Sequence, residues 1–91
     1  VSKQAVADRF MTALQKTEAA HDPGPVAGLF ADDAELTNLA RPEPARGADG
    51  ARQFWADYLK AFGEIRSEFT LAVADDRAAV LEWASEGTLP N

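Results

Sequence analysis

Near Gly63 the hydrophobic period of this chain changes from helical to alternating for the whole remaining third, and this change limits the chain to a mixed fold. Before it, apolar residues recur at helical spacing in two segments: Val6, Phe10, Ala13 and Leu14, then Ala51, Phe54, Trp55, Tyr58, Leu59 and Phe62. After it, apolar and polar residues alternate, as they do along a half-buried strand. The sequence therefore predicts a single α+β domain over residues 1–91, with helices packed on antiparallel strands.

Capping and turn residues set the ends of the two helices. Ser2 is a suitable N-cap for a helix over residues 3–20, because its hydroxyl can accept a backbone N–H that has no partner inside the helix. The sequence Pro23-Gly24-Pro25 ends that helix, and its second proline can open a short helical turn. The second helix is predicted over residues 48–62, where Gly63 supplies the stop.

One strand and one loop are predicted in the middle of the chain. Residues 34–39 alternate so that Leu36 and Asn38 share one face of the strand. Residues 41–47 contain two prolines, which oppose both a helix and a central strand, so a loop is expected there.

The last third of the chain predicts an antiparallel hairpin. Its strands cover residues 65–73 and 79–86, and Asp75-Asp76-Arg77 makes the turn between them. Strict alternation places five side chains on one face of the first strand: Ile65, Ser67, Phe69, Leu71 and Val73.

Composition excludes several classes of protein. Nine Lys and Arg stand against fifteen Asp and Glu, for a net charge of −6. Because no basic cluster is present, binding to nucleic acid or to an anionic membrane surface is not expected. The chain has no cysteine, a single histidine and no carboxylates at ligand spacing, so no metal site is predicted. No cofactor is predicted either, since the chain has no glycine-rich phosphate loop.

Targeting signals are also missing from the sequence. No apolar run approaches the ~20 residues that a membrane helix needs. The N-terminal residues lead into an amphipathic pattern, without the apolar stretch of a signal peptide. The cytoplasm is therefore the expected location.

Three short motifs and the order of the elements point to a known superfamily. The motifs are LFADDAEL at residues 29–36, Arg46-Gly47 ahead of a helix that contains Phe54-Trp55, and AVLEW at residues 79–83. The chain resembles the nuclear transport factor two-like superfamily, in its SnoaL-like (polyketide cyclase-like, ketosteroid isomerase-like) branch. The resemblance implies a cone-like, curved antiparallel sheet wrapped around helices. Members usually continue with two more strands, so the domain is expected to be incomplete at its C-terminus.

The resemblance does not assign a catalytic residue. Ketosteroid-isomerase-like members place a carboxylate base on the first strand and a tyrosine on the first helix, where this chain has Asn38 and Phe10. Limonene-epoxide-hydrolase-like members use an asparagine that matches Asn38, with a tyrosine two residues earlier where this chain has Leu36. Their arginine and aspartate match Trp83 and Ser85. Scytalone-dehydratase-like members use pocket histidines, which the single loop histidine does not match.

Five side chains are predicted to contact a ligand: Asn38, Trp55, Tyr58, Trp83 and Phe10. An inward amide at Asn38 can hold a carbonyl or a water, and the aromatic rings can line a pocket for a flat molecule. Tyr58 is the only phenol in the chain. The alternative interpretation is core packing for the rings and a hydrogen bond to a neighbouring loop for Asn38.

Other ionisable residues have simpler explanations. Asp32 and Asp33 suit a turn at a strand entry, because aspartate bonds its own nearby backbone. His21 follows the first helix, where a capping role is expected. Glu82 and Glu86 share an outer face of the hairpin, and a solvent-facing or dimer surface is expected for them.

The predicted function is binding of a small hydrophobic molecule, with the ligand undetermined and catalysis open. One alternative is an isomerase, cyclase or epoxide-hydrolase type of enzyme that acts by proton transfer. The other is a non-catalytic dimeric interaction module. A homodimer is expected through the outer face of the hairpin, formed by Val80, Glu82, Ala84 and Glu86.

Overall fold

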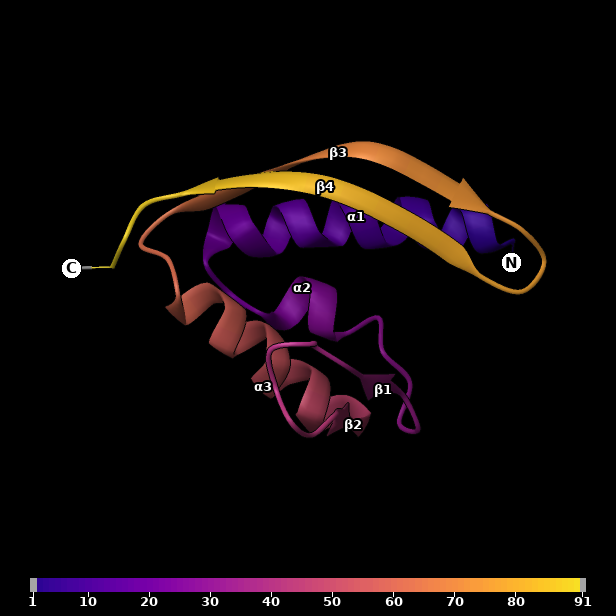
Figure 1. The fold of residues 1–91 in the computed structure, drawn as a ribbon, viewed down its shortest axis with the longest axis horizontal. Helices are drawn as coiled ribbons and strands as arrows, with labels where there is room; N and C mark the ends of the chain where they lie inside the picture. Colours follow the sequence, from indigo (N-terminus) through magenta and orange to yellow (C-terminus); the bar gives the residue numbers. More distant parts are fainter. Residues whose placement is uncertain (1, 91) are drawn as a thin grey trace.

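The computed structural model describes residues 2–90 and has the predicted α+β architecture. Its elements in chain order are α1 (Lys3–Ala20), α2 (Gly24–Ala27), β1 (Glu35–Leu36), β2 (Ala45–Arg46), α3 (Gly47–Lys60), β3 (Ile65–Ala74) and β4 (Ala79–Gly87). The strands form two antiparallel pairs, β1–β2 and β3–β4. The long β3–β4 hairpin curves along α1, and α2 lies between α1 and α3 (Figure 1). The helices thus stand on the concave side of the hairpin.

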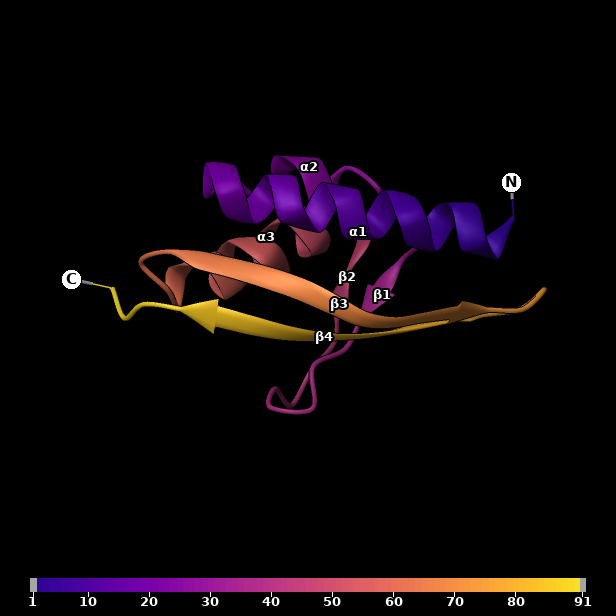
Figure 2. The same ribbon diagram turned by 90° about the horizontal axis from the view of Figure 1, so that it is seen from above.

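α1 begins and ends where its capping residues predict. The Ser2 hydroxyl accepts a hydrogen bond from the backbone N–H of Ala5 at 3.1 Å. His21 is the C-cap residue, with a left-handed φ of 53°. The buried face differs from the prediction in the first turns, where Val6 is 45% exposed and the neighbouring Ala7 is buried. The view from above places α1 against one face of the hairpin (Figure 2).

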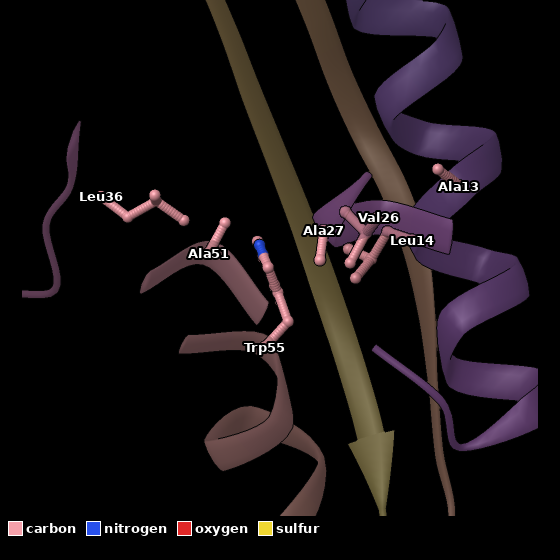
Figure 3. Packing of buried hydrophobic residues seen from close by; sticks show 7 residues of the cluster. All are labelled: Ala13, Leu14, Val26, Ala27, Leu36, Ala51 and Trp55. Atoms are coloured by element: carbon pink, nitrogen blue, oxygen red, sulfur yellow. The ribbon is translucent and has the colours of Figure 1, made fainter. Parts of the chain in front are cut away.

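The core lies where α1, α2, β1 and α3 meet. Its buried cluster consists of Ala13, Leu14, Val26, Ala27, Leu36, Ala51 and Trp55 (Figure 3). Leu14 and Val26 are fully buried, and burial of such a side chain contributes about 1.5–3 kcal/mol. The fully buried Thr17 hydroxyl accepts a hydrogen bond from the backbone N–H of Val26 at 3.0 Å, which holds α2 against α1.

The predictions for the middle of the chain were wrong in extent. Only β1 forms from the predicted strand over residues 34–39, and β2 lies inside the segment predicted to be a loop. The strand stops early because the Asn38 side chain accepts the N–H of Ala40, and its carbonyl accepts that of Arg41, both at 2.9 Å. β2 starts after Pro44, so its pairing with β1 needs no proline N–H.

Glycines mark both ends of α3. Gly47 has a φ of +72°, and its N–H donates to the carbonyl of Ala34 at 2.8 Å, so the chain turns from β2 into the helix at this residue. A Cβ there would lie 3.0 Å from the backbone oxygen of Asp32. Gly63 follows the helix, and its N–H donates to the carbonyl of Thr88 at 2.8 Å. The end of β4 is thereby tied to the end of α3.

The predicted hairpin and its turn are confirmed. β3 and β4 pair from Ile65 with Gly87 at one end to Ala74 with Ala79 at the other. In the turn, Asp75 Oδ1 accepts two backbone N–H groups, that of residue 77 at 2.8 Å and that of residue 78 at 2.9 Å. These two bonds lower the pKa of Asp75 below its ordinary value of 3.8.

A β-bulge overturns the predicted alternation in the second half of β3. The register shifts between Phe69 and Leu71, which leaves Thr70 as the extra residue. Beyond the bulge Ala72 takes the inward position. Leu71 and Val73, predicted to lie on the same face as Phe69, are 41% and 49% exposed on the outer face. One extra residue reverses which side chains face the helices.

Candidate ligand-binding site

A pocket of about 380 Å³ opens between α3, β4 and the turn that follows β1. Its lining is rich in aromatic side chains and consists of Asn38, Arg41, Phe54, Trp55, Asp57, Tyr58, Ala61, Phe62 and Trp83. This volume suits a small organic molecule. Three recesses are larger. Those of about 610 Å³ at the end of the hairpin and about 470 Å³ beside α1 have no aromatic residue in their lining, and a third of about 490 Å³ on the hairpin has only Trp83.

Trp55 is the centre of the aromatic part of this pocket. Its ring centroid lies 5.2 Å from that of Phe54 and 5.4 Å from that of Tyr58, both in edge-to-face geometry. Trp55 is 6% exposed, whereas Trp83 on the opposite wall is 36% exposed. The ring of Phe10 packs behind both tryptophans, at 5.9 Å from Trp55 and 6.1 Å from Trp83. The Trp55 wall of the pocket is therefore packed in place by its neighbours, and the Trp83 wall is accessible to solvent.

Four of the five predicted ligand contacts line this pocket: Asn38, Trp55, Tyr58 and Trp83. The fifth, Phe10, supports the two tryptophans from the core side. Asn38 was expected on an inward strand face. It lies instead in an exposed turn at the edge of the pocket. The Asx turn occupies its Oδ1, so only its Nδ2 donors are available to a ligand.

An ion pair holds the turn after β1 against α3. Arg41 Nη2 lies 2.8 Å from Asp57 Oδ2, and Gln53 Nε2 donates to the other oxygen of Asp57 at 2.8 Å. The hydrogen bonds from Arg41 and Gln53 lower the pKa of Asp57 below its ordinary value of 3.8. An exposed pair of this kind contributes little to stability, but it fixes one edge of the pocket.

Glu18 is a buried carboxylate that sequence reasoning missed. It is 5% exposed on α1, and its Oε2 accepts hydrogen bonds from the Tyr58 hydroxyl at 2.7 Å and from the Ser67 hydroxyl at 2.6 Å. The Ser67 hydroxyl also lies 2.7 Å from that of Ser85. Within residues 2–90, the second oxygen of Glu18, Oε1, is buried without a hydrogen-bond partner. The available signal was an acidic residue four positions after the buried Leu14, on the apolar face of the helix.

Tyr58 belongs both to the pocket lining and to the hydrogen bonds of Glu18. Burial raises the pKa of the Tyr58 hydroxyl above its ordinary value of 10.0, and the hydrogen bond to Glu18 raises it further. The phenol is therefore neutral at physiological pH and keeps the proton that it donates to Glu18.

The remaining ionisable candidates lie apart from the pocket. Asp32 and Asp33 are exposed, and His21 caps α1. Glu82 and Glu86 are exposed on the outer face of β4, where Glu86 pairs with Arg66 at 2.9 Å. Among residues 2–90, no three His, Cys, Asp or Glu side chains converge as metal ligands. No helix in this part of the chain is long and apolar enough to cross a membrane.

Helices on the concave side of a curved antiparallel hairpin are the arrangement expected of the nuclear transport factor two-like class of α+β domains. A sequence profile of the SnoaL-like domain matches residues 7–91, and the chain belongs to this family. The resemblance inferred from the motifs is thus confirmed. No curated protein matches the chain with significant similarity. Since one fold hosts many chemistries, the family assigns neither a ligand nor a reaction.

Proposed function

We propose that this SnoaL-like domain binds a small, largely apolar molecule in the pocket between α3, β4 and the turn after β1. The observation that carries the proposal is the meeting of Trp55, Tyr58 and Trp83 with Asn38 around about 380 Å³. Rings from α3 and β4 offer flat apolar walls, and a few polar groups at the edge can orient a bound molecule.

The polar side chains at the edge of the pocket, Asn38, Arg41 and Asp57, favour a binding function over a catalytic one. Arg41 and Asp57, the guanidinium and the carboxylate of the lining, are paired with each other. The Asn38 amide cannot take up a proton at neutral pH. General acid–base chemistry needs an ionisable group in reach of the ligand, so the proposal is a binding domain. The acidic groups of the lining, Asp57 and Tyr58, are engaged with Arg41 and Glu18, and the enzyme alternative would need one of them to be released.

The proposal is tested by filling the pocket. Ala61 lies in the lining beside Phe62, and Ala61→Trp places an indole in the space that a ligand would use. The probe is 2-naphthol, a neutral two-ring molecule, titrated into the protein by calorimetry. Ala61→Trp should weaken its affinity at least about tenfold, since the ring loses its apolar contacts.

The matched control is Ala84→Trp, the same substitution on the exposed outer face of β4. It should leave the affinity for 2-naphthol unchanged. Equal affinities of Ala61→Trp and the unmodified protein would place the probe elsewhere and refute the pocket as the binding site. An absence of any binding by the unmodified protein would refute the proposed function.

A further inference from the structure

The recess of about 470 Å³ beside α1 is a second candidate site, which we call the α1–α2 groove. Its lining shares no residue with the aromatic pocket and consists of Asp8, Arg9, Thr12, Ala13, Lys16, Pro25 and Leu29. Its volume falls in the range of small-molecule sites. Because the lining contains no aromatic side chain, the groove suits an aliphatic group better than a flat ring.

The two walls of the α1–α2 groove are fixed to each other by the fold. The Thr17 hydroxyl on α1 accepts the backbone N–H of Val26 on α2 at 3.0 Å, and both residues are fully buried. Leu29 follows α2, and its N–H donates to the carbonyl of Val26 at 3.2 Å. A ligand would therefore lose little affinity to ordering the walls of the groove.

The floor of the α1–α2 groove is apolar. Ala13 belongs to the buried core, Pro25 is half-buried, and Leu29 is 44% exposed. A single exposed leucine is ordinary for a soluble protein. Here Leu29 lines a recess together with two other apolar residues, so an aliphatic chain in the groove would remove apolar surface of both partners from water.

Two cations border this apolar floor, and neither is paired. Arg9 and Lys16 are seven residues apart on α1, so they lie on one side of the helix, about 10 Å apart along its axis. Within residues 2–90, the ion pairs join three other arginines to carboxylates. No acidic residue stands three or four positions from Arg9 or Lys16 on the helix. In a chain with a net charge of −6, this local positive charge favours an anionic ligand.

Asp8 decides which of the two cations can hold an anion. Its carboxylate lines the groove next to Arg9 and accepts a hydrogen bond from Gln4 at 3.1 Å. This charge would repel an anion at the Arg9 end of the groove. Lys16 stands two turns farther along α1, next to Thr17 and its contact with α2. The anionic group of a ligand is therefore expected at Lys16.

We infer that the α1–α2 groove binds an aliphatic molecule with a carboxylate head, which pairs with Lys16 while its chain lies over Ala13 and Leu29. The inference goes beyond the proposed function, because it concerns a second site with a different class of ligand. Each methylene that the chain buries adds affinity, and the charge of Lys16 distinguishes the carboxylate from a neutral head.

The test compares octanoate with acetate and with octan-1-ol, each titrated into the protein and followed by NMR chemical shifts. Octanoate should bind at least about tenfold more tightly than acetate, which has the head without the chain. It should bind about three- to fivefold more tightly than octan-1-ol, which has the chain without the charge. Equal affinities in either comparison would overturn the inference.

Substitutions of Lys16 test its role. Lys16→Gln removes the charge and keeps a polar side chain, so octanoate should then bind no more tightly than octan-1-ol. Lys16→Arg keeps the charge and should keep the preference. The matched control is Lys3→Gln, the same substitution on α1 outside the lining of the groove, which should leave the preference unchanged. A preference for octanoate that survives Lys16→Gln would overturn the inference.

The remaining outcomes concern where octanoate binds and what else could cover the groove. Ala61→Trp fills the aromatic pocket and should leave the affinity for octanoate unchanged, whereas a loss would place octanoate in that pocket and overturn the inference. A dimer in sedimentation equilibrium that Lys16→Gln dissociates would mean that a second copy of the chain covers the groove, which would also overturn it. Failure of octanoate to bind would refute the second site and leave the proposed function to its own test with 2-naphthol.

Discussion

Tyr58→Phe should destabilise the domain measurably, because it removes one of the two donors to a buried carboxylate. A hydrogen bond to a charged group contributes about 1.5–3 kcal/mol to stability. The Tyr58 ring is only partly buried, so we expect the lower part of this range, about 1.5–2 kcal/mol. In a domain of this size, each kcal/mol lowers Tm by about 4–8 °C, which gives a loss of roughly 6–16 °C. The phenylalanine ring keeps the contacts with Trp55 and Phe62, so packing contributes little to this loss.

Urea denaturation followed by circular dichroism gives the free energy of unfolding directly. The matched control is Thr70→Val, which deletes a hydroxyl that makes only a 3.3 Å contact with the Glu82 carbonyl on the exposed side of the hairpin. Its loss should stay below about 0.5 kcal/mol. A double-mutant cycle of Tyr58→Phe with Glu18→Gln should show a coupling of about 1 kcal/mol. A loss in Tyr58→Phe no larger than in Thr70→Val, with no coupling to Glu18, would show that this hydrogen bond does not support the fold.

Three further predictions concern other parts of the structure. Thr17→Val leaves the buried N–H of Val26 without its acceptor and should cost about 1–3 kcal/mol in urea denaturation, whereas Thr17→Ser should cost less than half as much. Gly47→Ala forces an alanine to a φ of +72° with its Cβ 3.0 Å from the Asp32 oxygen, and should cost more than about 1 kcal/mol; a smaller loss would mean that α3 can start elsewhere. The raised pKa of Tyr58 disfavours its phenolate in the folded state, so the stabilisation is complete below its ordinary value of 10.0 and is lost as pH rises through the folded-state pKa. Urea midpoints should fall more steeply above about pH 10 in the unmodified protein than in Tyr58→Phe.

The helices and the hairpin could be predicted because their periods are long and their ends carry capping and turn residues. Ser2 and the Asp75 turn have local roles that depend on neighbours within three residues. The bulge at Thr70 could not be predicted, because apolar residues continue at positions 71 and 73 and suit either face of an alternating strand.

The site was only partly predictable for a related reason. The spacing of the aromatic residues identified those of the pocket walls. This spacing can be read within α3 and within β4 without knowing how the two elements pack together. The role of Glu18 depends on partners 40 and 49 residues away, on other elements. A single acidic residue in a helix is ordinary for a soluble protein, and only the tertiary structure shows that this one is buried.

The hydrogen bonds of Glu18 also bear on how long the folded state lasts. They join residues separated by 40 and 49 positions and draw on α1, α3 and β3. Closing loops of this length costs entropy before the contact forms, whereas each helix and the hairpin can form from local contacts. We therefore expect the bonds to Glu18 to form late, after the helices and the hairpin have docked. Interactions absent from the folding transition state act on the unfolding rate, so removing the Tyr58 or Ser67 hydroxyl should speed the unfolding of the domain and leave its folding rate almost unchanged.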